Sequence, residues 1–185
     1  MKRVLNSGTI RLPFVAKEED LLHTLGDGKS HDLRFNFDIK APLLTFLTFQ
    51  DSNLGTLNRN PKLDHPIAYL PSQFYTTDNM LLDSKDCNTY NSKLFNFYTA
   101  AINFYNKLIA DGMNREQAAL VLPQGMLINF SWEVKASELI WFIEKYYNAS
   151  PEIYGYCCTL VIYLEEHLPD VTRWLKQNRW QSIGL

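Results

Sequence analysis

Two segments of the chain alternate apolar and polar side chains with a period of two. In residues 33–39, leucine, phenylalanine and isoleucine alternate with arginine, asparagine and aspartate. In residues 127–134, Ile128, Phe130, Trp132 and Val134 would share one face. This alternation is typical of a strand with one face on the core. We expect two strands, the first ending at Ala41-Pro42 because proline cannot donate to a neighbouring strand.

Apolar residues recur every three or four positions in three later segments, which predicts helices. The segments cover residues 91–111, 136–147 and 151–167. Gly112 follows the first and is suited to a left-handed C-terminal cap. A further short helix is expected after Asn114, whose side chain can cap its N-terminus.

Other segments give weaker signals. Residues 43–49 form an almost continuous apolar run that is compatible with a strand or a buried helix. Residues 50–66 and 72–91 are rich in polar and turn-forming residues, so we expect loops. The tail from Arg173 to Trp180 is basic and aromatic and is expected to dock on the body of the protein or on a neighbouring subunit.

Composition narrows the class of protein. The chain has 185 residues, 46% of them hydrophobic and 21% charged, which predicts one globular domain spanning residues 1–185. Its formal net charge of -2 makes a nucleic-acid partner improbable. No apolar run is long enough to cross a membrane, and the N-terminus lacks the apolar region of a secretory signal. We therefore expect a cytoplasmic location.

The residue types that commonly form catalytic or metal sites are scattered. The three cysteines, Cys87, Cys157 and Cys158, lack the spacing of a zinc knuckle or redox pair and are expected to be reduced. The four histidines do not form a metal-binding motif, and no phosphate-binding loop or nucleophile elbow occurs. We predict no metal site and name no catalytic residue.

Three motifs nevertheless occur in a characteristic order. Residues 35–42 read F-x-F-x-x-K-A-P, residues 112–123 read G-x-x-R-E-x-A-x-x-V-L-P, and residues 132–139 read W-E-V-K-A-S-E-L. In this order the chain resembles the flavin-dependent thymidylate synthases. The resemblance implies an α/β (α+β) fold with a curved, mostly antiparallel sheet flanked by helices. It also implies a homotetramer that binds FAD and dUMP between its subunits.

The chain departs from this family where phosphate groups would bind. The family's R-H-R and N-E-x-S-x-R-Y stretch is replaced by residues 50–62, in which only Asn58 fits. Ala119 replaces the arginine of the E-x-A-R-x-x-L-P motif, and residues 135–137 read K-A-S in place of N-A-R. Each charge-assisted hydrogen bond contributes about 1.5–3 kcal/mol, so losing several would weaken dUMP or FAD binding by many powers of ten.

These departures lead to two hypotheses and a third possibility. The main one is a pseudoenzyme: a non-catalytic binding or assembly subunit related to pyrimidine nucleotide metabolism. It would carry no cofactor and would form a homo-oligomer, as a tetramer, or a hetero-oligomer with a related subunit. The alternative is a flavin- or nucleotide-dependent transferase acting on an altered pyrimidine nucleotide, with FAD if the family site is retained. An unrelated α/β interaction domain is the third.

For the alternative, six residues are the candidates for nucleotide or flavin binding. The cations and polar groups come from the predicted loop, and the two tyrosines could stack on a ring. They are Asn58, Arg59, Lys62, His65, Tyr146 and Tyr147.

Overall fold

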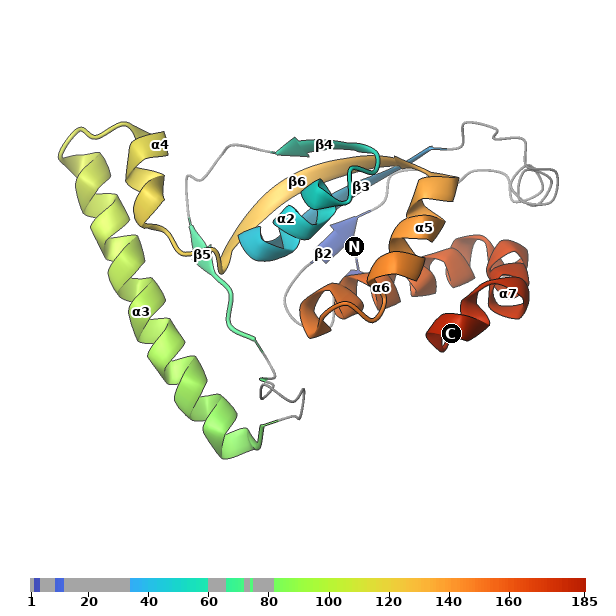
Figure 1. Cartoon of the computed structure of the whole chain (residues 1–185). Helices are drawn as coiled ribbons and strands as arrows, with labels where there is room; N and C mark the ends of the chain where they lie inside the picture. The colour runs from blue at the N-terminus through green and yellow to red at the C-terminus, as the bar shows by residue number, and fades with distance from the viewer. Residues whose placement is uncertain (1, 4–8, 12–33, 60–65, 72–73, 75–81) are drawn as a thin grey trace.

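A sheet of antiparallel strands organises the protein (Figure 1). The computed structural model describes residues 2–3, 9–11, 34–59, 66–71, 74 and 82–185. Within them the strands pair in the order β1-β2-β3-β6-β4, and β5 also pairs with β6. Their bounds are β1 Lys2–Arg3, β2 Thr9–Arg11, β3 Arg34–Pro42, β4 Thr56–Arg59, β5 Ile67–Ala68 and β6 Met126–Lys135.

The two predicted strands are β3 and β6, and they form the centre of the sheet. They pair along their whole length, from Arg34 opposite Lys135 to Pro42 opposite Leu127. The strand β3 ends at Pro42 as expected, and α2 begins at the next residue. The antiparallel α+β architecture inferred from the resemblance is confirmed.

Helices follow most of the predicted segments. The helix α5 covers Ala136–Tyr146 and α6 covers Pro151–His167, which confirms both predictions. Gly112 has a φ of 87°, the left-handed conformation expected after the long helix. Asn114 caps α4, Arg115–Ala118, because its side chain accepts a hydrogen bond of 2.9 Å from the Glu116 N–H.

Other segments differ from their predictions. The apolar run at residues 43–49 is helical, as α2, Leu43–Asp51. The segment 50–66, predicted to be a loop, contains β4, which is held by pairing with the distant strand β6. The long helix α3, Ser84–Ala110, begins at Ser84 and not near residue 91, because Asp83 accepts a hydrogen bond from the Asp86 N–H at 2.8 Å and caps an earlier turn.

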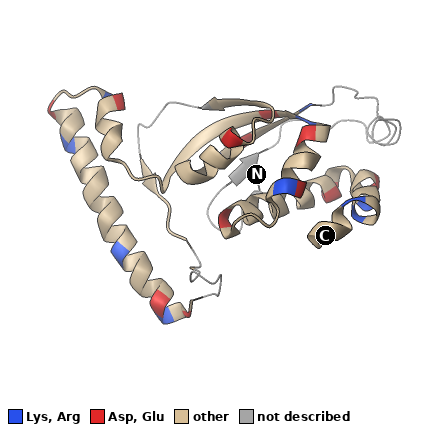
Figure 2. Ribbon diagram, in the orientation of Figure 1, with Lys and Arg blue, Asp and Glu red and all other residues tan. Residues whose placement is uncertain are grey.

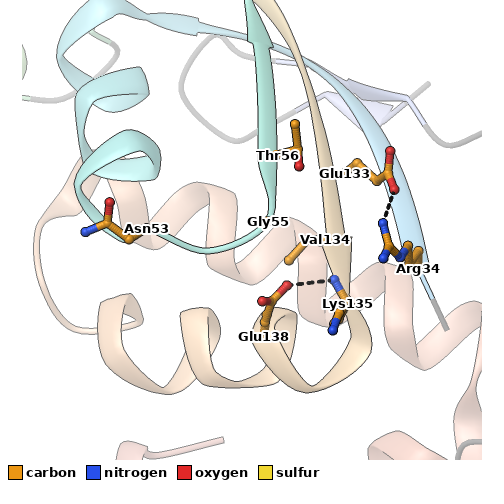
Figure 3. Close-up of a pocket in the computed structure, with 8 residues that line it drawn as sticks. All are labelled: Arg34, Asn53, Gly55, Thr56, Glu133, Val134, Lys135 and Glu138. Carbon is orange, nitrogen blue, oxygen red and sulfur yellow. Dashed lines mark hydrogen bonds and ion pairs between the residues drawn. The ribbon is translucent and has the colours of Figure 1, made fainter. Parts of the chain in front are cut away.

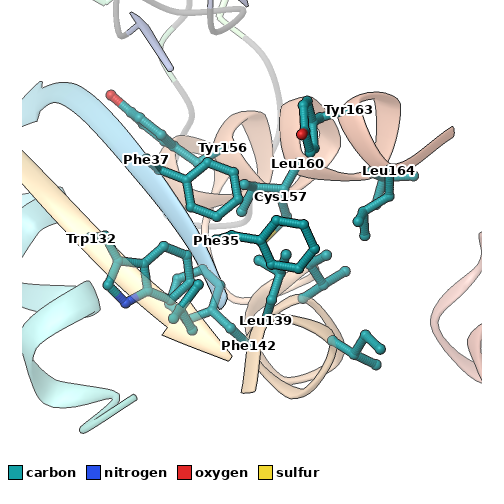
Figure 4. Close-up of a cluster of buried hydrophobic side chains, with 14 of the residues drawn as sticks. Phe35, Phe37, Trp132, Leu139, Phe142, Tyr156, Cys157, Leu160, Tyr163 and Leu164 are labelled. Atoms are coloured by element: carbon teal, nitrogen blue, oxygen red, sulfur yellow. The ribbon is translucent and has the colours of Figure 1, made fainter. Parts of the chain in front are cut away.

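The hydrophobic core lies between one face of the sheet and the helices α2, α5 and α6 (Figures 1 and 4). Alternate residues of β3 and β6 point into it, including Phe37 and Trp132, which are fully buried. Phe49 of α2 packs at its centre, with its ring centroid 4.7 Å from that of Phe142 and 5.0 Å from that of Trp132. The opposite face of the sheet therefore carries the polar side chains.

The C-terminal tail packs on the body of its own chain, which is one of the two arrangements expected from the sequence. It forms α7, Pro169–Asn178, and a short 3-10 helix, Trp180–Ile183. Trp180 is fully buried, and Arg179 forms an ion pair of 2.8 Å with Glu144 of α5.

The helix α3 stands apart from the helices α2, α5, α6 and α7, and the short helix α4 lies beside one of its ends (Figure 1). Of its 27 residues, only Tyr98 and Tyr105 are buried. Across the part of the chain that the structure describes, every helix is too short or too polar to span a bilayer.

Candidate functional site

The polar face of the sheet is built from the side chains that alternate with the core residues. Asp38 of β3, Ser131 of β6 and Asn58 of β4 are cross-strand partners and form a row across three strands. Residues directly opposite in a sheet point to the same side, so all three face away from the core. Both Asp38 and Asn58 are exposed.

The tight turn between α2 and β4, residues 52–55, lies at one end of this face. Asn53 and Gly55 have φ values of 56° and 64°. A Cβ atom at Gly55 would collide with the carbonyl oxygen of Glu133. The indole of Trp132 donates a hydrogen bond of 2.9 Å to the Leu54 carbonyl, which fixes the turn against β6. Glycine is required here because the two backbones are in contact.

A cavity of about 220 Å³, which we call the sheet-edge pocket, opens at this turn (Figure 3). The turn contributes Asn53, Gly55 and Thr56 to its lining. The start of β3, the end of β6 and the first turn of α5 complete it with Arg34, Glu133, Val134, Lys135 and Glu138.

Two cationic and two anionic side chains line the sheet-edge pocket. Arg34 forms an ion pair of 2.8 Å with Glu133, and their side chains are 53% and 40% exposed. The backbone N–H of Lys135 donates a hydrogen bond of 3.1 Å to Glu138 (Figure 3). An ion pair this exposed contributes only about 0–1 kcal/mol, so Arg34 can exchange its partner for a ligand at little cost.

The residues predicted from the loop are only partly described. Asn58 lies in β4 on the polar face, and Arg59 ends the same strand with its backbone opposite Phe130. Lys62 and His65 lie outside the described residues.

The two predicted tyrosines lie on the other side of the sheet, at the end of α5. Tyr146 packs on Phe142, with ring centroids 4.8 Å apart, and Lys145 lies over its ring. Tyr147 is buried with its ring 5.0 Å from that of Tyr154, and burial, assisted by a hydrogen bond to Tyr154, raises its pKa. The structure therefore does not bring the tyrosines together with Asn58.

Sequence reasoning missed the charged residues of the sheet-edge pocket. Alternation does place Arg34 and Glu133 on polar faces, but they are 99 positions apart and only the register of β3 with β6 brings them together. The sequence marks Lys135 only as the residue that stands in place of an asparagine. Across the described part of the chain, no group of histidine, cysteine or acidic side chains is arranged to hold a metal, and its three cysteines are free.

Comparison with known proteins identifies the class. The family model described as thymidylate synthase complementing protein matches residues 55–170, so the chain belongs to this family, the flavin-dependent thymidylate synthases. No curated protein matches the chain by sequence.

Solved structures confirm the fold. The chain is similar to the UMP/dUMP methylase PolB from Streptomyces cacaoi bound with 5-Br UMP, with a TM-score of 0.77, 16% identity, and coverage of 93% of this chain and 95% of that chain. The same enzyme bound with 5-Br dUMP gives a TM-score of 0.75, 14% identity, and coverage of 95% and 97%.

The family uses FAD, but the described residues of the sheet-edge pocket do not fit it. The volume of about 220 Å³ lies below the roughly 300–1,000 Å³ of pockets that enclose drug-sized ligands. We therefore derive no chemistry through a flavin.

Proposed function

We propose that the protein is a nucleotide-directed member of its family that binds a pyrimidine nucleoside monophosphate at the sheet-edge pocket. This corresponds to a transferase acting on an altered pyrimidine nucleotide. One observation carries the proposal: the pocket joins the two segments that stand where the family carries its ligand-binding motifs. Asn53, Gly55 and Thr56 come from the first segment, and Lys135 comes from the second.

The chemistry of the pocket suits the sugar and phosphate of a mononucleotide. Arg34 and Lys135 supply the positive charge that a phosphate requires. The carboxylates of Glu133 and Glu138 accept hydrogen bonds from sugar hydroxyls, the role that acidic residues have at ribose in other nucleotide sites. A cavity of about 220 Å³ surrounds this end of the nucleotide and leaves the base outside.

A panel of thermal unfolding experiments tests the proposal. We expect UMP or dUMP to raise the unfolding midpoint, because a ligand at a hundredfold excess over its Kd adds about 2.7 kcal/mol to the free energy of unfolding. The matched ligands are uridine, which lacks the phosphate, and AMP, which has a different base. If no pyrimidine monophosphate moves the midpoint, or if uridine moves it equally, the proposal is wrong. Flavin absorbance of the purified protein would show that FAD binds elsewhere.

A second candidate function, an assembly subunit, is favoured by the surface of α3. Three of its phenylalanines are more than half exposed: Phe95 at 56%, Phe97 at 58% and Phe104 at 51%. The helix also carries few charges (Figure 2). Exposed aromatic surface of this kind marks protein interaction sites.

Members of the family are typically homotetramers, so a second copy of this chain is the partner that we propose for α3. The related-subunit partner, the single domain over residues 1–185 and the cytoplasmic location stay predictions.

A further inference from the structure

The sheet-edge pocket holds two cations and a carboxylate on one face of the sheet, in a fixed order. Arg34 of β3 and Lys135 of β6 are cross-strand partners, so their side chains leave the same face next to each other. Glu133 precedes Lys135 by two positions in β6 and therefore shares this face. Two residues of a strand span about 6.8 Å, so the two cations and this carboxylate lie roughly one sugar ring apart.

The ion pair between Arg34 and Glu133 links the two ends of this arrangement (Figure 3). Both side chains are partly exposed, so the pair contributes little to stability and can open at little cost. A ligand that opens it must offer an acceptor to Arg34 and hydrogen-bond donors to Glu133, because a charged group without a partner is unfavourable. A phosphate is such an acceptor, and sugar hydroxyls are such donors.

Glu133 is better placed to receive those hydroxyls than Glu138. One oxygen of Glu138 accepts a hydrogen bond of 3.1 Å from the Lys135 N–H and takes part in the N-terminal cap of α5. Moving the Glu138 carboxylate would therefore uncap the helix. The hydrogen-bond partner of the Glu133 side chain among the described residues is Arg34, so both oxygens of Glu133 can turn to a ligand once Arg34 has moved to the phosphate.

We propose that Glu133 selects a ribonucleotide over a deoxyribonucleotide by accepting hydrogen bonds from both the 2′ and the 3′ hydroxyl of the sugar. These two hydroxyls lie on the same face of ribose and match the two oxygens of one carboxylate, and an acidic residue holds ribose in this way in dinucleotide sites. Deoxyribose offers only one of the two donors. The inference rests on the proposed function, because the phosphate has to draw Arg34 away from Glu133.

A second role for Glu133 makes a different prediction. A carboxylate that only oriented Arg34 would act on the phosphate, and it would affect UMP and dUMP alike. A contact with the 2′ hydroxyl affects UMP alone. The ratio of the two affinities therefore separates the two roles, since a change in the phosphate contact is common to both nucleotides and cancels.

The test is calorimetric titration of the native protein with UMP, dUMP and the arabinose analogue of UMP. We expect UMP to bind about 10–150-fold more tightly than dUMP, the factor for one charge-assisted hydrogen bond. The arabinose analogue carries its 2′ hydroxyl on the opposite face of the sugar from the 3′ hydroxyl. It should bind no more tightly than dUMP.

A variant of Glu133 assigns the preference to this residue. Glu133→Gln keeps the shape of the side chain but has only one acceptor oxygen, so the ratio of UMP to dUMP affinity should fall by at least about fivefold. The control Asp38→Asn removes an exposed carboxylate from β3, on the same face of the sheet but outside the pocket lining, and should leave the ratio unchanged.

The outcomes separate this inference from the proposed function. Equal binding of UMP and dUMP by the native protein, or an unchanged ratio in Glu133→Gln, would overturn the selection by Glu133 and leave the nucleotide site intact. Binding of neither nucleotide would overturn the proposed function and this inference with it. The comparison of the three ligands uses the native protein, so it decides the question even if Glu133→Gln does not fold.

Discussion

At the scale of single residues, the sheet-edge pocket depends on a glycine and a tryptophan. The positive φ of Gly55 and its contact with the Glu133 carbonyl exclude a side chain at this position. The hydrogen bond from Trp132 to the Leu54 carbonyl holds the same turn. Because Glu133 also lines the pocket, a side chain introduced at Gly55 would displace a pocket residue as well as the turn.

We predict that Gly55→Ala lowers the free energy of unfolding by more than about 2 kcal/mol, since it combines a left-handed conformation with a backbone collision. The matched control is Gly112→Ala, where φ is 87° and no atom lies within 4 Å of the added Cβ. The free energy of unfolding of that variant should fall by only about 1–2 kcal/mol, the cost of the left-handed conformation alone. Urea unfolding of both variants measures the difference, and equal losses would contradict the collision at Gly55.

At the scale of elements, regular periodicity was enough to predict the strands β3 and β6 and the helices α5 and α6. The strand β4 could not be predicted, because its four residues carry no alternation signal and depend on pairing with β6. The pocket was missed for a related reason. Arg34 and Glu133 meet only through the register of β3 with β6, and the turn at Gly55 meets β6 only through β4. Long-range pairing decides both features, and neither is visible in a local window.

The junction of α5 and α6 gives a prediction of pH dependence. Burial raises the pKa of Tyr147 above its ordinary value of 10.0, so the unfolded chain loses this proton first as the pH rises. The contribution of Tyr147 to the free energy of unfolding is therefore fully present below about pH 10 and is lost as the pH increases above that value.

In Tyr147→Phe, the unfolding free energy should therefore fall less steeply above about pH 10 than in the native protein. At neutral pH the substitution should lower the unfolding free energy by about 1 kcal/mol, because one hydrogen bond is lost. Urea unfolding from about pH 8 to 11 tests this. An unchanged alkaline slope would show that Tyr147 ionises normally in the folded protein.

At the scale of the whole molecule, the sheet and the long helix differ in how far their apolar side chains are buried. The core covers one face of the sheet, while α3 leaves aromatic side chains in solvent. Exposed apolar surface is unfavourable in a monomer, so α3 is the element most in need of a partner.

We predict that the protein forms a homo-oligomer and that the double substitution Phe97→Ser and Phe104→Ser dissociates it, as measured by sedimentation. The control Ile162→Ser removes an apolar side chain of comparable exposure, 44%, from α6 and should leave the oligomer intact. A monomeric native protein, or an oligomer unaffected by the α3 substitutions, would exclude α3 as the interface.

The most direct test of the nucleotide site is calorimetric titration of UMP and dUMP into the native protein and the variant Arg34→Gln. The pocket predicts saturable binding of one nucleotide per chain and a loss of at least about tenfold in affinity for the variant, from one charge-assisted hydrogen bond. The control Arg173→Gln removes an exposed arginine that is paired with Asp170 on α7 and should bind like the native protein. Absence of binding to the native protein, or equal binding by the native protein and Arg34→Gln, would contradict the proposed site.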